Sequence, residues 1–88
     1  MAKVFCVDWF EDDEACIAKE AGWSLHLSVQ DAATYTRDQA SAHFGHGQPY
    51  GVEVPDEVCE EVRRTTHGVF KSSPRECPYP AVAEGPGL

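Results

Sequence analysis

Four cysteines and four histidines are the residues of this chain that could bind a metal ion or supply a nucleophile. They are Cys6, Cys16, Cys59, Cys77, His26, His43, His46 and His67. Structural zinc sites usually take their ligands from closely spaced pairs such as C-x2-C or H-x3-H. Here only His43 and His46 are close in sequence, and Gly45 lies between them. We therefore expect no metal site and no other cofactor; a small zinc module stays open as a third hypothesis.

Nucleophilic catalysis requires a thiol or hydroxyl within hydrogen-bond reach of a base, and no local motif of this chain pairs the two. Cys59 precedes Glu60 and Glu61, whose negative field disfavours the reactive thiolate. Cys77 precedes Pro78 in a segment whose composition predicts no fixed surroundings to activate it. We expect no catalytic residues and predict that the chain is not an enzyme.

Acidic residues outnumber basic ones: the chain has 15 Asp and Glu against 7 Lys and Arg, which gives a net charge of −8. One acidic block runs from Glu11 to Glu14 and directly follows Trp9 and Phe10; the other occupies residues 53–61. Such a chain repels nucleic acid and anionic membranes and attracts basic protein surfaces. We predict partner contacts at both blocks, with two aromatic anchors: Glu11, Asp12, Asp13, Glu14, Glu53, Asp56, Glu57, Glu60, Glu61, Trp9 and Tyr50. The alternative is that Trp9 and Phe10 belong to the core and that the first block caps the next helix.

The chain has 88 residues, of which 42% are hydrophobic, and this is enough for one small domain with a thin core. We expect that domain over residues 1–71, followed by a flexible tail, rich in Pro and Gly, over residues 72–88. No stretch approaches the roughly 20 apolar residues that span a bilayer, and Val4–Val7 is too short for the apolar core of a secretory signal. We therefore expect a cytosolic protein, in which the cysteines are reduced thiols.

Alternating apolar residues predict three strands, at residues 3–10, 23–27 and 50–54. The first has apolar side chains on both faces, which is typical of an inner strand. Residues 68–71 are expected to add a last extended piece. The segment at residues 14–21 is part of a connection too long for a tight turn, and we predict one or two helical turns there.

Two helices are predicted from their start signals. Ser28 and Asp31 fit a capping box, so a helix is expected over Val29–His43. Residues at helical spacing predict an apolar stripe that continues to Phe44, with Tyr35 at its border. Pro55 lacks the amide hydrogen that a first helical turn leaves without a partner, which favours a second helix start. The predicted fold is α+β in the order β-β-α-β-α, with a small antiparallel sheet of two or three strands and both helices packed on one face.

The runs LSVQDAATYTRDQ and PYGVEVPDEVCEEV resemble a layout found among small phage and bacterial proteins. Within the second run, YGVEVPDEVCEE at Tyr50 to Glu61 is similar to a segment of a small acidic family of phage anti-CRISPR proteins that act on type I-F systems. That resemblance implies a non-enzymatic mechanism in which acidic residues block the DNA-binding surface of a CRISPR effector complex. It also implies that five carboxylates of this segment face a basic partner: Glu53, Asp56, Glu57, Glu60 and Glu61.

Charge and resemblance together predict a phage-encoded acidic binding protein of the host cell cytosol. Its partner would be the basic surface of a nucleic-acid-binding protein or complex, which the chain would inhibit by occupying that surface. No direct contact with nucleic acid or with a membrane is expected. The alternative is an interaction or assembly module that works through an apolar face and is compatible with a homo-oligomer; its acidity would then serve solubility only.

Overall fold

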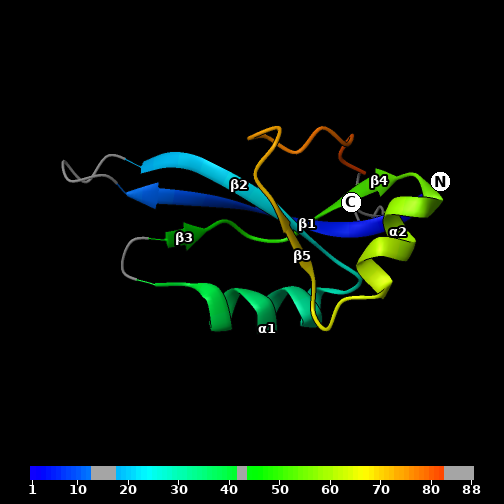
Figure 1. Cartoon of the computed structure of the whole chain (residues 1–88), viewed down its shortest axis with the longest axis horizontal. Coiled ribbons are helices and arrows are strands. Elements are labelled where there is room, and N and C mark those ends of the chain that lie inside the picture. The colour runs from blue at the N-terminus through cyan, green and yellow to red at the C-terminus, as the bar shows by residue number, and fades with distance from the viewer. Residues whose placement is uncertain (13–17, 42–43, 83–88) are drawn as a thin grey trace, which may run out of the picture.

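The computed structural model describes residues 1–12, 18–41 and 44–82 (Figure 1). Within these residues the elements follow the order β-β-α-β-β-α-β: β1 (Ala2–Asp12), β2 (Ala18–His26), α1 (Val29–Gln39), β3 (Phe44–His46), β4 (Tyr50–Val54), α2 (Asp56–Arg63) and β5 (Val69–Lys71). The fold is α+β, as predicted. Its antiparallel sheet, however, has five strands, so the expectation of two or three was wrong.

The sheet is built around β1, whose apolar residues on both faces predicted an inner strand. One edge of β1 pairs with β2 along most of its length. The other edge pairs with β4 over Ala2–Cys6 and then with β3 over Trp9–Glu11. β5, the extended piece expected near residues 68–71, adds to β2. β3 could not be predicted from its residues, because three exposed residues show no alternating pattern.

The two helices cover opposite faces of the sheet, which corrects the prediction that both pack on one face. α2 packs Val62 on a core that includes Val4 of β1. α1 packs Ala32 against Val7 of the same strand. Successive side chains of a strand point to opposite faces. A strand that is apolar on both sides therefore requires a cover on both sides.

The first predicted helix begins where expected and ends earlier. The Ser28 hydroxyl accepts a hydrogen bond from the Asp31 N–H at 3.0 Å, as the capping box predicts. The helix ends at Gln39 rather than at His43, which lies outside the described residues. Phe44 was expected on the apolar stripe of this helix and instead begins β3.

The helical turns predicted at residues 14–21 are also corrected where they can be compared. Residues 13–17 lie outside the described part of the chain, and residues 18–21 belong to β2. Their backbone pairs with the end of β1. Pairing with a strand already in place here outweighs the low strand propensity of Ala, Lys and Glu.

The segment after β5 lies on the face of the sheet opposite α1, and Figure 1 shows it above the strands with α1 below. Main-chain hydrogen bonds of 3.0 and 2.9 Å join Pro80 and Val82 to β4. The ring of Tyr79 packs edge-on against Trp23, with centroids 5.8 Å apart. The mobility expected of residues 72–88 stays a prediction, but as far as residue 82 this segment makes defined contacts that its Pro-rich composition did not indicate.

Candidate partner-binding site

The two acidic blocks lie at opposite ends of the molecule, with the end of β1 at the left of Figure 1 and α2 at the right. In the first block Glu11 is exposed and Asp12 ends β1, whereas Asp13 and Glu14 lie outside the described residues. The second block, on β4 and α2, has all its carboxylate residues exposed: Glu53, Asp56, Glu57, Glu60 and Glu61. Glu11 and the second block therefore lie on separate surfaces.

The second block is partly neutralised by neighbouring cations. Three of its carboxylates form ion pairs, Asp56 with the Met1 amino group at 3.4 Å, Glu60 with Arg63 at 3.3 Å and Glu61 with Lys71 at 2.7 Å. Exposed pairs of this kind add little stability. They do reduce the negative potential that a basic partner would meet at this end.

Trp9, predicted as a surface anchor, is only 2% exposed. Its indole N–H donates to Ser24 Oγ at 2.8 Å. Its ring contacts Tyr35 edge-on, with centroids 6.1 Å apart, and lies 5.3 Å from the ring of His46. Trp9 therefore belongs to the core between β1 and α1, and the part of it that a partner could reach is the ring surface at the bottom of a hollow.

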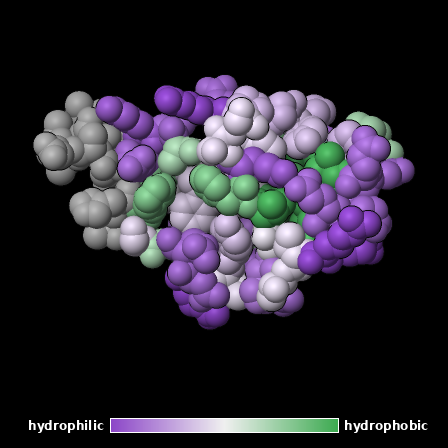
Figure 2. Space-filling model, viewed as in Figure 1, coloured by the Kyte–Doolittle hydropathy of each residue, from purple (hydrophilic) through white to green (hydrophobic). Residues whose placement is uncertain are grey.

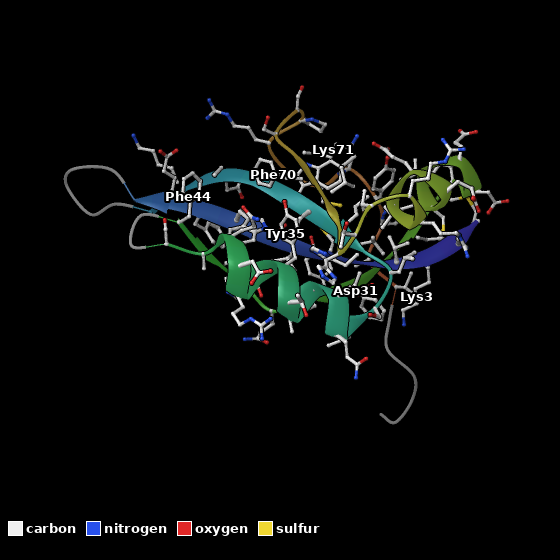
Figure 3. The ribbon with its side chains drawn as sticks, turned by 60° about the horizontal axis from the view of Figure 1, so that its bottom comes forward. Lys3, Asp31, Tyr35, Phe44, Phe70 and Lys71 are labelled. Atoms are coloured by element: carbon white, nitrogen blue, oxygen red, sulfur yellow. The ribbon has the colours of Figure 1, made fainter. Side chains whose placement is uncertain are left out.

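That hollow has a volume of about 280 Å3, and we call it the aromatic groove. It is lined by Trp9, Tyr35, Gln39, Phe44 and Phe70. Figure 3 shows Tyr35, Phe44 and Phe70 coming from α1, β3 and β5. Phe44 and Phe70 are 36% and 40% exposed, and Figure 2 shows hydrophobic surface in an interrupted band across this view, bordered by hydrophilic surface. Because ligand pockets start at about 300 Å3, the groove suits one large side chain rather than a whole cofactor.

Strand pairing explains how these side chains meet. Phe44 pairs with Glu11 across β1 and β3, two residues beyond Trp9 on the same face of β1. Phe70 lies over Gly22, where a Cβ atom would come within 2.6 Å of its ring. Position 22 therefore requires glycine, because any side chain there would clash with the Phe70 ring. The first acidic block consequently begins beside the groove.

Sequence reasoning missed three of the four aromatic residues of the groove. Phe44 has the spacing of a helical stripe and was placed on one, and Tyr35 was placed at the border of that stripe. Phe70 lies in a strand too short to show which face it occupies. The available signal was the chemical type alone, since aromatic residues are enriched at binding surfaces.

A serine and a histidine in the core are close enough to suggest a catalytic pair. Ser24 Oγ lies 2.7 Å from His26 Nε2, and His26 Nδ1 lies 2.8 Å from the His67 carbonyl oxygen. Both side chains have no exposed surface, so a substrate cannot reach the hydroxyl. Burial lowers the pKa of His26, although the His67 carbonyl and Asp31 act in the opposite direction. We assign this pair to the packing of β2.

Tyr50, the second predicted anchor, is half-buried and turned toward β1. Its hydroxyl donates to Asp8 Oδ1 at 3.1 Å, and burial raises its pKa.

Within residues 1–12, 18–41 and 44–82, no three His, Cys, Asp or Glu side chains gather closely enough to hold a metal ion. The same residues include no helix with the length and apolar character that a membrane crossing requires.

No protein-family model, curated protein or solved structure matches this chain. The similarity of residues 50–61 to an anti-CRISPR family therefore stays a prediction. The case for function rests on the groove, the charge and the side chains described above.

Proposed function

We propose that this chain is a non-enzymatic acidic binding protein whose partner is the basic surface of a nucleic-acid-handling protein complex. The observation that carries this proposal is the aromatic groove, where Phe44 and Phe70 stay more than a third exposed beside the acidic end of β1. Aromatic side chains around a pocket are typical of the residues that dominate binding energy. A net charge of −8 attracts a cationic surface and raises its rate of association.

The groove and its acidic border define the chemistry of the partner segment. It would place one apolar side chain in the groove, with Lys or Arg beside it to face the block that begins at Glu11. By occupying a basic surface, the chain would exclude the nucleic acid that normally binds there. In the specific form that the resemblance implies, the chain is phage-encoded, acts in the host cell cytosol and blocks a CRISPR effector complex.

The geometry gives the two acidic blocks different roles in this proposal. The first block adjoins the groove and would make short-range contacts. The second block lies at the far end, and three of its carboxylates have cationic partners of their own. It would contribute mainly to long-range attraction.

A second candidate function is assembly of the chain with itself through the same groove. β3 and β5 are edge strands of the sheet, and each carries an exposed phenylalanine. Edge strands with exposed apolar residues are common sites of strand-to-strand association. In that case the groove would be buried in a homodimer, and the acidity would serve solubility.

The test is a tagged pull-down from bacterial lysate, washed at roughly 0.05 M and then 0.5 M salt to change the screening length. We expect a nucleic-acid-binding complex that is retained at low salt, released at high salt and displaced by added DNA. Phe44→Ala should weaken its binding by about 30-fold or more, because truncation of a hot-spot side chain costs at least about 2 kcal/mol. Retention of the partner at high salt, or after addition of DNA, would contradict the proposal.

Matched variants separate the two acidic blocks. Glu11→Gln with Asp12→Asn and Glu53→Gln with Glu57→Gln each change the net charge from −8 to −6, at opposite ends of the molecule. The first pair should weaken binding more than the second. Equal losses would show that only net charge matters.

Sedimentation tests the homodimer. In that case the mass of the wild type should increase with protein concentration, whereas Phe44→Ser should stay a monomer.

A further inference from the structure

The segment that follows β5 holds Cys77 in a fixed place against the sheet. The indole N–H of Trp23 donates to the Pro74 carbonyl oxygen at 2.8 Å. On the other side of Cys77, Pro80 and Val82 are joined to β4 by main-chain hydrogen bonds. Because the segment is anchored on both sides of Cys77, this cysteine has defined surroundings, unlike a cysteine in an unrestrained tail.

Cys77 lines a polar pocket of about 210 Å3 where this segment meets the sheet. The other lining residues are Asp8, Glu20, Gly22, Tyr50, Arg75 and Glu76. Next to Cys77 lies Cys6 of β1, which has no exposed surface, and Cys77 packs against the core cluster that contains Cys6. The Tyr50 hydroxyl also interacts with both thiols.

The surroundings of the two thiols favour different protonation states. The hydrogen bond from Cys6 lowers the pKa of Cys77 to about 7, with help from the Tyr79 main-chain N–H and the Tyr50 hydroxyl, against burial and Asp8. The same thiol–thiol hydrogen bond, followed by burial, raises the pKa of Cys6. Of the two thiols, Cys77 is thus the one that ionises first as the pH rises, and Cys6 is the one that keeps its proton. A thiolate in an accessible pocket is a nucleophile, whereas a buried thiol is inert to reagents.

We propose that Cys77 and Cys6 form a peroxide-reactive thiol pair, in which Cys77 is the attacking cysteine and Cys6 the resolving one. The pocket admits a small polar oxidant to Cys77, while Cys6 can be reached only by the sulfur already beside it. The pair lies on the face of the sheet opposite α1, so this chemistry is independent of the aromatic groove.

The reaction balances with one peroxide and two thiols. The Cys77 thiolate attacks one peroxide oxygen, the O–O bond breaks, and hydroxide leaves while Cys77 becomes a sulfenic acid. The Cys6 sulfur then attacks the Cys77 sulfur, and its proton leaves with the displaced hydroxide as water. Two electrons pass from the two thiols to the peroxide. The new disulfide fastens the segment containing Cys77 to β1.

The test uses the full, reduced chain with one equivalent of hydrogen peroxide at pH 7.5, followed by alkylation and cleavage after Glu. Such cleavage separates all four cysteines, because Glu11, Glu20 and Glu76 lie between successive cysteines. We expect one disulfide, joining the peptide of residues 1–11 to the peptide of residues 77–84. In Cys6→Ser, Cys77 should instead be trapped by dimedone as a sulfenic acid. A disulfide that involves Cys16 or Cys59, or the absence of any disulfide, would overturn the proposal.

Alkylation by iodoacetamide measures the accessibility and reactivity of Cys77 without an oxidant. Because Cys77 and Cys59 are compared within the same wild-type chain, the result does not depend on whether a variant folds. Cys77 should react about tenfold or more faster than Cys59, which is buried on α2. Tyr50→Phe keeps the ring and removes the hydroxyl, so the pH midpoint of Cys77 alkylation should move upward, with an unchanged circular dichroism spectrum. Equal rates for Cys77 and Cys59 would show that Cys77 is an ordinary cysteine and that the pair has no special reactivity.

Discussion

Trp9, Ser24, His26 and His67 form one hydrogen-bond chain through the core. A carbonyl oxygen can only accept, so the Nδ1–H of His26 donates to His67; in the neutral ring, which the lowered pKa of His26 favours, Nε2 is the acceptor. The Ser24 hydroxyl therefore donates to Nε2, and its oxygen accepts from the Trp9 indole. Within the described residues no buried side-chain nitrogen or oxygen lacks a partner. These hydrogen bonds fit the neutral form of His26, which burial favours in the folded state.

The position of His26 depends on Gly68, which has a φ of +158°. A Cβ atom at Gly68 would come within 2.7 Å of the Leu25 carbonyl oxygen and would overlap the His26 ring. We expect Gly68→Ala to lower the free energy of unfolding by about 2 kcal/mol or more, from backbone strain and the displaced ring. Urea unfolding measures this. Gly47→Ala is the control, because its Cβ would meet no atom within 4 Å; equal losses in the two variants would refute the packing argument.

The buried neutral state of His26 also predicts a pH dependence. The pKa of His26 is lowered, first by burial, so the unfolded chain takes up a proton at a pH where the folded chain does not. Stability from this residue is complete above about pH 6.5 and falls as the pH decreases below that value. Relative to His26→Gln, the wild type should therefore lose part of its stability advantage between pH 7.5 and pH 5.5, as measured by urea unfolding. A stability advantage that grows at low pH would contradict the assignment.

At the scale of elements, the sequence predicted those features that depend on neighbours in the chain. The Ser28 cap needs only a hydroxyl three residues before an amide, and the inner position of β1 follows from its own apolar residues. β3 and the start of β2 could not be predicted in this way. Their residues have weak strand patterns, and they are strands because β1 is long enough to pair beyond its contacts with β4.

The candidate sites show the same limit. The groove joins Trp9, Phe44 and Phe70, which become neighbours only through pairing with β1 and β2. Cys6 and Cys77 are far apart in sequence and meet because residues 80–82 align with β4. Composition located the acidic blocks, since charge is visible in the sequence. It could not show that they lie at opposite ends.

At the scale of the whole molecule, the charge of −8 is spread over a fold of 88 residues. Ion pairs between α2 and its neighbours offset part of the charge at one end, but such exposed pairs contribute little stability. The remaining carboxylates repel one another more strongly in the compact fold than in the expanded unfolded chain. Self-repulsion is therefore expected to dominate the response to salt.

We predict that the free energy of unfolding increases as NaCl is raised from about 10 mM to about 0.2 M, because the screening length falls from about 30 Å to below 10 Å. Urea unfolding at several NaCl concentrations measures the slope. Replacing Glu11, Glu53 and Glu57 with Gln and Asp12 with Asn changes the net charge from −8 to −4, and this variant should show a smaller increase. A wild-type stability that falls with salt would mean that the pairs around α2 outweigh the repulsion, and the acidity would then be locally compensated rather than available to attract a basic partner.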